Sequence, residues 1–143
     1  MASQNADMLY FVQQMIVLRK RHPSIMRRRF LTGKTIDGKN MTDIAWHGAQ
    51  LDCPQWLDSE TRILAFTLAG SDDNEADVHI VMNMSDDNVT ADLPVINGKE
   101  WCLAVDTSLP SYQDIVVLQN QKPLSHHSYL VSSKSVVAFE NTK

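Results

Sequence analysis

The stretch RILAFTLAGSDDNEADVHIVMNM, residues 62–84, decides the fold class of this chain. Its first part, residues 62–70, is almost continuously apolar, which is typical of a strand that is covered on both faces. In its last part, residues 77–84, every second residue is apolar, as in a strand with one buried face. The acidic run between them predicts a solvated hairpin tip. The stretch therefore predicts two antiparallel strands joined by an exposed loop.

Similar segments recur at short intervals on both sides of this hairpin. They are DIAWH (43–47), VTADLP (89–94), EWCLAVDT (100–107), DIVVLQ (114–119), HSYLVS (127–132) and SVVAFEN (135–141). The dipeptide Asn97-Gly98 is a strong turn signal between two of them. Strands at this spacing with no helix between them predict an antiparallel β-sandwich. We therefore assign residues 34–143 to a mainly β domain.

One amphipathic α-helix is predicted ahead of the strands, over residues 6–22. Its apolar residues are Met8, Leu9, Phe11, Val12, Met15, Ile16 and Leu18. At 100° per residue they cover an arc of about 180°. This arc is wider than the stripe of an ordinary surface helix, so the helix needs cover on two sides. Pro23 ends the helix, and residues 1–33 form an N-terminal helix with a basic connector.

A basic run, LRKRHPSIMRRRFLTG, occupies residues 18–33. The cations that suit the last helical turn, where the helix dipole favours positive charge, are Arg19, Lys20, Arg21 and His22. Arg19 also falls inside the apolar arc, so we expect it to be buried beside a carboxylate or free carbonyl groups. Arg27, Arg28 and Arg29 predict a segment that is solvated or lies against another surface.

Composition excludes several function classes. The chain has 143 residues, which is about one domain, and a formal net charge of −4. Because the chain is acidic overall, the basic run is a weak signal for nucleic-acid binding, and no nucleic-acid partner is expected. No apolar run is long enough to cross a membrane, and the first fifteen residues lack the cations of a signal peptide. The expected location is the cytoplasm.

The chain offers no constellation that is typical of catalysis or metal binding. Cys53 and Cys102 have no CxxC spacing, so neither a zinc ribbon nor a disulfide scaffold is expected. His47 and His79 fit strand positions with local hydrogen bonds. We therefore predict no catalytic residue, no metal and no cofactor. The aromatic residue that the strand pattern explains least is Trp56, which lies in a polar loop.

Two further stretches resemble a known family. FVQQMIVLRKRHPSIMRRRFLTG (residues 11–33) and MTDIAWHG (residues 41–48) resemble the end of an isoamylase-type glycogen debranching enzyme of the α-amylase superfamily. The later strand segments, from RILAFTLAG to YLVSSKSVVAFE, fit the same C-terminal region in the same order. The resemblance implies that the helix corresponds to the last helix of a (β/α)8 barrel and that the rest is the following β-sandwich.

The resemblance does not extend to the chemistry of the family. Its catalytic carboxylates lie at the ends of barrel strands, in motifs that include Arg-x-Asp and His-Asp, and neither motif occurs here. The expected role is therefore a non-catalytic domain that covers the catalytic barrel of an enzyme hydrolysing α-1,6-glucosidic branch linkages in glycogen. The residues expected to face the barrel or another interface are Phe11, Met15, Leu18, Arg19, Arg27, Arg28 and Arg29.

Two alternatives stay open at the level of sequence. The first is a module that binds glycogen or maltooligosaccharide through Trp56, with Tyr112 from the LPSYQD loop. The second is a stand-alone interaction protein whose helix folds back on the sandwich or forms a homo-oligomer, because an uncovered apolar helix face often becomes an interface. The sequence also leaves open whether the chain is a fragment or a complete gene product.

Overall fold

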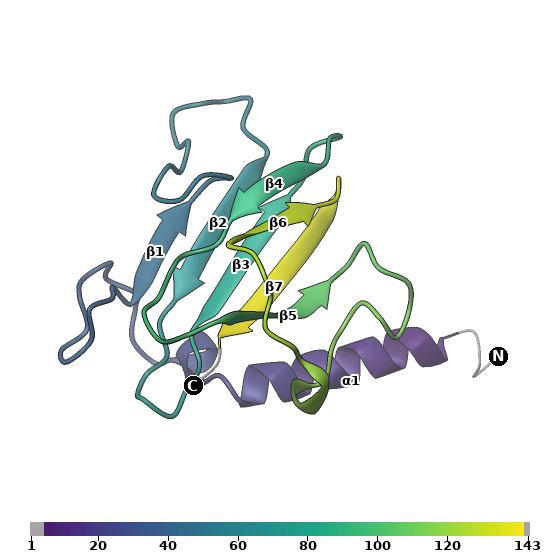
Figure 1. Cartoon of the computed structure of the whole chain (residues 1–143), viewed down its shortest axis with the longest axis horizontal. Helices are drawn as coiled ribbons and strands as arrows, with labels where there is room; N and C mark the ends of the chain where they lie inside the picture. Colours follow the sequence, from purple (N-terminus) through teal and green to yellow (C-terminus); the bar gives the residue numbers. More distant parts are fainter. Residues whose placement is uncertain (1–4, 142–143) are drawn as a thin grey trace.

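The computed structural model describes residues 5–141, which form one α-helix, two short 3₁₀ helices and seven strands (Figure 1). The helices are α1 (Ala6–Lys20), η2 (Pro23–Met26) and η3 (Leu118–Asn120). The strands are β1 (Ile44–His47), β2 (Ile63–Leu68), β3 (Val78–Asn83), β4 (Val89–Asp92), β5 (Trp101–Asp106), β6 (Ser128–Val131) and β7 (Ser135–Asn141). This mainly β architecture with one N-terminal helix confirms the predicted fold class.

The strands form two antiparallel sheets. One sheet has five strands in the order β1-β2-β3-β7-β5, and the other pairs β4 with β6. The hairpin predicted from residues 62–84 is β2–β3, in which Ile63 lies opposite Asn83 and Leu68 lies opposite Val78. Both flanking strands of this hairpin are antiparallel to it, as the short strand spacing predicts.

The larger core lies between the two sheets. Its buried residues are Ala65, Val81, Ala91, Leu93, Trp101, Val131, Val137 and Phe139. These side chains come from one face of the five-stranded sheet and from the β4–β6 pair, which lies in front of that sheet in Figure 1. Asn83 fastens the two sheets, because its amide group donates to the carbonyl oxygens of Val131 and Ser132.

A smaller core forms on the opposite face of the five-stranded sheet, where α1 packs. Leu18 of the helix is buried there with Ala104, Val105, Ile115 and Ala138, and Tyr10, Phe11, Met15 and Ile80 pack around them. Figure 1 shows α1 running along the lower end of the sheet. The described chain therefore has three layers: a helix, a five-stranded sheet and a two-stranded sheet.

The acidic loop between β2 and β3 corrects one prediction. Asp72 and Asp73 are exposed, as expected for a solvated tip, but Glu75 and Asp77 are buried. The loop folds back on its own start, where a Cβ on Gly70 would lie only 2.3 Å from the carbonyl oxygen of Glu75. Two carboxylates in this loop thus anchor structure instead of facing water.

The segment predicted as a strand over residues 114–119 is not one. It forms a single bridge between Ile115 and Val105 and then turns into η3. Of its apolar residues, Ile115 is buried in the small core beneath α1, whereas Leu118 is exposed. The predicted division of the chain into an N-terminal segment, residues 1–33, and a β domain, residues 34–143, stays a prediction.

Candidate functional site

The two faces of α1 have different surroundings. Phe11, Met15 and Leu18, which we expected to face a barrel or another interface, pack on the sheet of this chain instead. The apolar residues left exposed on the helix are Met8, Leu9, Val12, Ile16 and Val17. The predicted need for cover on two sides is therefore half met within residues 5–141. We call Met8, Leu9, Val12 and Ile16, which share one side at helical spacing, the outer helix face.

Arg19 corrects the prediction of burial. It is exposed, and its guanidinium forms no ion pair within residues 5–141. It follows Met8 by eleven and Val12 by seven residues, spacings that place it on the outer helix face. Arg19 therefore does lie within the apolar arc of the helix, but the part of the arc that contains it points away from the sheet.

The cation at the end of the helix that pairs with a buried carboxylate is Arg21, whose own side chain is 22% exposed. Its Nε and Nη2 atoms each donate to a carboxylate oxygen of Glu140 at 2.7 Å. His22, which is 1% exposed, also contacts Glu140 through Nε2 and lies with Nδ1 3.9 Å from Glu75 Oε1. Glu75 accepts the backbone N–H of Ser24 at 2.8 Å. This group of side chains, the junction cluster, joins the helix end to β7 and to the acidic loop.

The junction cluster sets the charge of Glu140. Burial alone would raise the pKa of this carboxyl, but hydrogen bonds from His22, Arg21 and Gln121 outweigh it and lower the pKa to about 2. Glu75 behaves alike: burial opposes its ionisation, yet hydrogen bonds from Ser24 and Ser71 lower its pKa. Sequence reasoning missed this cluster, although one signal was present, a lone glutamate in the apolar strand SVVAFEN.

The arginines after η2 divide into two kinds. Arg27 is held within the chain, because its Nε donates to the Ser24 carbonyl at 2.9 Å and its Nη1 lies 4.0 Å from Asp43 Oδ2. Arg28 and Arg29 are exposed. Of the predicted basic cluster, only these two side chains point away from the described fold.

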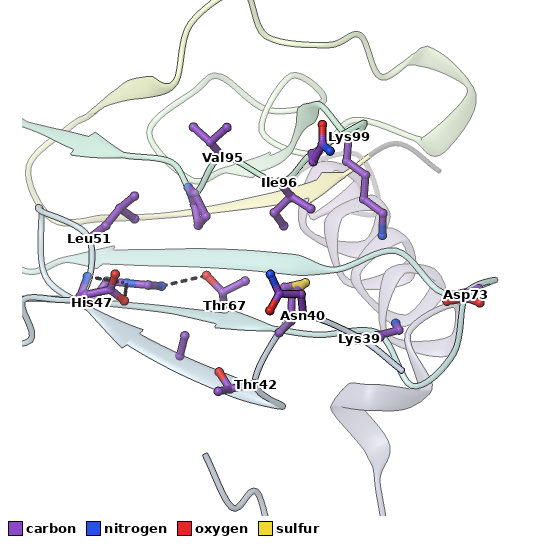
Figure 2. Close-up of a pocket in the computed structure, with 15 residues that line it drawn as sticks. Lys39, Asn40, Thr42, His47, Leu51, Thr67, Asp73, Val95, Ile96 and Lys99 are labelled. Atoms are coloured by element: carbon purple, nitrogen blue, oxygen red, sulfur yellow. Dashed lines mark hydrogen bonds and ion pairs between the residues drawn. The ribbon is translucent and has the colours of Figure 1, made fainter. Parts of the chain in front are cut away.

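A cavity of about 670 Å³ opens at the β1 side of the sandwich. Figure 2 shows His47 and Thr67 on one wall, Leu51, Val95 and Ile96 on others, and Lys39 and Lys99 at one end. Both lysines are already engaged: Lys39 donates to the carbonyls of Gly70 and Asp72, and Lys99 lies 3.3 Å from Asp77.

The histidines beside this cavity are tied into the sheet. The backbone N–H of Asp52, held at a φ of 57°, donates to His47 Nδ1 at 2.9 Å, which places the ring proton on Nε2. That proton is shared with Thr67 Oγ1 at 3.0 Å, and Thr67 lies 2.8 Å from His79 Nδ1. Burial lowers the pKa of both rings, of His79 to about 3, although the charge of Asp52 acts in the opposite direction on His47.

The hydrogen bonds of His47, Thr67 and His79 cross-link three strands and leave no free ring nitrogen of His47 for proton transfer. The lone pair of His47 is occupied by the Asp52 amide, so it cannot act as a base toward a ligand in the cavity. The local hydrogen bonds predicted for His47 and His79 are confirmed. Among residues 5–141 no group of three His, Cys, Asp or Glu side chains is arranged to hold a metal ion.

Trp56 and Tyr112 lie in different parts of the molecule. Trp56 packs against Trp46 at a centroid distance of 5.4 Å, and Trp46 in turn contacts Phe66 at 5.5 Å. Tyr112 instead lies 5.1 Å from Tyr10 of α1. The two aromatics predicted for glucan contact therefore do not form one surface.

Trp56 borders a shallow hollow of about 410 Å³ on the sheet face that also carries α1. We call it the aromatic hollow; it is lined by Gln55, Trp56, Thr61, Arg62, Ile63, Leu64, Met82 and Met84. Four of these residues come from the loop between β1 and β2. Figure 1 shows this loop at the end of the sheet remote from α1. The lining of the aromatic hollow is mainly apolar, and its polar side chains are Gln55, Thr61 and Arg62.

This antiparallel sandwich with a helix packed on one sheet agrees with the family match. Residues 45–142 match the family described as Isoamylase 1-3, C-terminal. The chain belongs to this family of isoamylase C-terminal domains. It also resembles "Isoamylase 2, chloroplastic" of Oryza sativa subsp. japonica, with 29% identity over 147 residues. That alignment covers 90% of this chain but only 17% of the rice protein.

No helix in the described part of the chain is both long and apolar enough to traverse a lipid bilayer.

Proposed function

We propose that this chain works as the non-catalytic C-terminal part of an isoamylase-type glycoside hydrolase, where it covers and stabilises the catalytic barrel. The parent activity would be the hydrolysis of α-1,6-glucosidic branch linkages in glycogen. The family match and the resemblance to the rice isoamylase support the parent class. The proposal assigns no step of the reaction to the residues of this chain.

The outer helix face is the observation that carries this proposal. Met8 is 63% exposed and Leu9 is 59% exposed, although the other side of the same helix is packed on the sheet. A helix that is apolar on both sides is typical of an element covered from two directions. A barrel wall would bury these side chains and could supply a carboxylate to Arg19, which has none within residues 5–141.

A binding experiment tests the proposal. The chain would be mixed with an isoamylase-type barrel truncated ahead of the segment equivalent to α1, and complex formation followed by gel filtration. We expect a complex that the double substitution Val12→Asp and Ile16→Asp weakens by about tenfold or more, because it places charge in a buried interface. The matched control is Gln13→Asp, an exposed polar position on α1. A complex indifferent to the double substitution, or none at all, would reject the proposal.

The non-catalytic role has its own assay. The chain alone, incubated with glycogen, should release no linear chains, and turnover by the purified chain would contradict this part of the proposal.

A homo-oligomer is the second candidate for the outer helix face, since the same apolar side chains could cover a second copy. Sedimentation of the chain alone distinguishes the two. A dimer that Val12→Asp and Ile16→Asp convert to a monomer would favour self-association over barrel binding.

The proposed location is the cytoplasm, as the sequence predicts. The rice relative carries a chloroplast location in its printed name. Fractionation of cells that express a tagged chain decides between the two compartments.

A further inference from the structure

We infer that the aromatic hollow is a secondary binding site for a linear α-1,4-linked glucan chain. The choice of an α-glucan as ligand rests on the proposed function, but the existence of a sugar site rests on the hollow itself. Its centre is Trp56, whose side chain is 61% exposed and stands against Trp46 at 5.4 Å. An exposed indole held in edge-to-face contact with a neighbouring ring offers an apolar face on which a sugar ring can stack.

Three side chains supply the polar part of the site. The side chains of Gln55, Thr61 and Arg62 border the hollow, and none of them forms a hydrogen bond or ion pair within residues 5–141. An amide, a hydroxyl and a guanidinium offer both donors and acceptors, which match the hydroxyl groups of a sugar. A few polar groups around an apolar floor are the usual composition of a small-ligand site.

The size and charge of the hollow favour a sugar over a protein. Eight residues line it, whereas a stable protein interface takes roughly 20–30 residues a side. Its volume of about 410 Å³ falls at the low end of the roughly 300–1,000 Å³ of small-ligand sites. Its lining contains one charged residue, Arg62, so a neutral polyhydroxylated ligand suits it better than a polyanion.

The hollow and the outer helix face are separate patches. The loop between β1 and β2, which supplies four residues of the hollow, lies at the end of the sheet opposite α1 (Figure 1). Residues of the hollow are also absent from the core beneath α1. A glucan held here could therefore bind while the outer helix face is covered.

The test is a titration of the full 143-residue chain with maltoheptaose, followed by NMR of the indole N–H groups. The chain has three tryptophans, and Trp101 is buried with its Nε1 donating to the Pro94 carbonyl at 2.6 Å. We expect the Trp56 and Trp46 signals to shift and the Trp101 signal to stay in place. Trp56→Ala should weaken binding by about tenfold or more, because a stacked tryptophan is a typical hot spot.

Two further variants make the result decisive. Tyr112→Ala removes another exposed aromatic that lies beside Tyr10, so binding should be unchanged. Arg62→Met keeps an unbranched apolar stem but removes the guanidinium donors, and it should weaken binding with no change in fold. The inference is overturned by no binding at millimolar maltoheptaose, or by binding that survives Trp56→Ala. Neither result bears on barrel association, and loss of that association with glucan binding intact would reject only the proposed function.

Discussion

Glu140 shows how a single residue fixes the geometry between helix and sheet. Its side chain is 3% exposed and accepts two hydrogen bonds from Arg21, one from Gln121 and a contact from His22. A buried carboxylate is tolerated only when its lone pairs are satisfied in this way. The helix end is thereby tied to the last strand through charge as well as through apolar packing.

Replacing Glu140 by glutamine should therefore destabilise the chain. The substitution keeps the shape but leaves Arg21 without its counter-charge, and breaking such a buried pair costs about 3 kcal/mol in the free energy of unfolding. Urea denaturation measures this change. The control is Asp86→Asn, which removes an exposed pair with Lys134 and should cost under about 0.5 kcal/mol. Equal effects of the two substitutions would contradict the role of the junction cluster.

The lowered pKa of Glu140 also predicts that the free energy of unfolding falls at acid pH. The pKa of Glu140 is about 2 in the folded chain against an ordinary value of 4.5, so the folded state favours its ionised form. Its contribution is complete above pH 4.5 and is lost as the pH falls from 4.5 toward 2. Unfolding curves at a series of pH values should show this loss. Glu140→Gln should reduce this loss of stability between pH 4.5 and pH 2. An unchanged loss in the variant would count against the lowered pKa of Glu140.

At the scale of elements, α1 has one packed side and one exposed side. Leu18, on the side that faces the sheet, is 6% exposed, whereas Val12, on the outer helix face, is 46% exposed. Leu18→Ala should lower the free energy of unfolding by about 3 kcal/mol, since it opens a cavity between α1 and the sheet. Val12→Ala should change it by less than about 0.5 kcal/mol in the isolated chain. Thermal unfolding of both variants checks which side of α1 is packed. A larger loss of stability for Val12→Ala than for Leu18→Ala would contradict this assignment.

How much of the fold sequence could predict depended on the kind of signal. The β2–β3 hairpin was predictable, because its apolar pattern reports burial directly. Which cation of the helix end would pair with a buried carboxylate was not, because Arg19 and Arg21 differ only in which side of the helix end meets the sheet. Residues 114–119 were mistaken for a strand, since Val116 and Val117 are as apolar in an irregular segment as in a sheet.

The candidate sites were predictable only in part, for a related reason. Trp56 stood out because a large aromatic in a polar loop is not explained by a strand pattern. Its partner Trp46 lies in the alternating strand segment DIAWH, yet it is 39% exposed and contacts Trp56. The burial of Glu75 depends on the loop returning to Ser24, a contact between residues 51 positions apart that no local pattern encodes.

For the molecule as a whole, the two faces of the five-stranded sheet are covered to different extents. The β4–β6 pair closes one face of the large sheet, whereas α1 covers only part of the opposite face and is itself apolar outward. A domain that finishes its burial against another domain would have this asymmetry. The central claim is therefore that the outer helix face becomes buried in a complex with an isoamylase-type barrel.

Methionine footprinting tests that claim most directly, because oxidation reports the exposure of individual side chains. Met8 lies on the outer helix face and is 63% exposed, whereas Met84, in the aromatic hollow, is 43% exposed and serves as the reference. With the truncated barrel added, we predict that oxidation of Met8 falls several-fold and that of Met84 stays the same. Equal oxidation of Met8 with and without the barrel would contradict the claim.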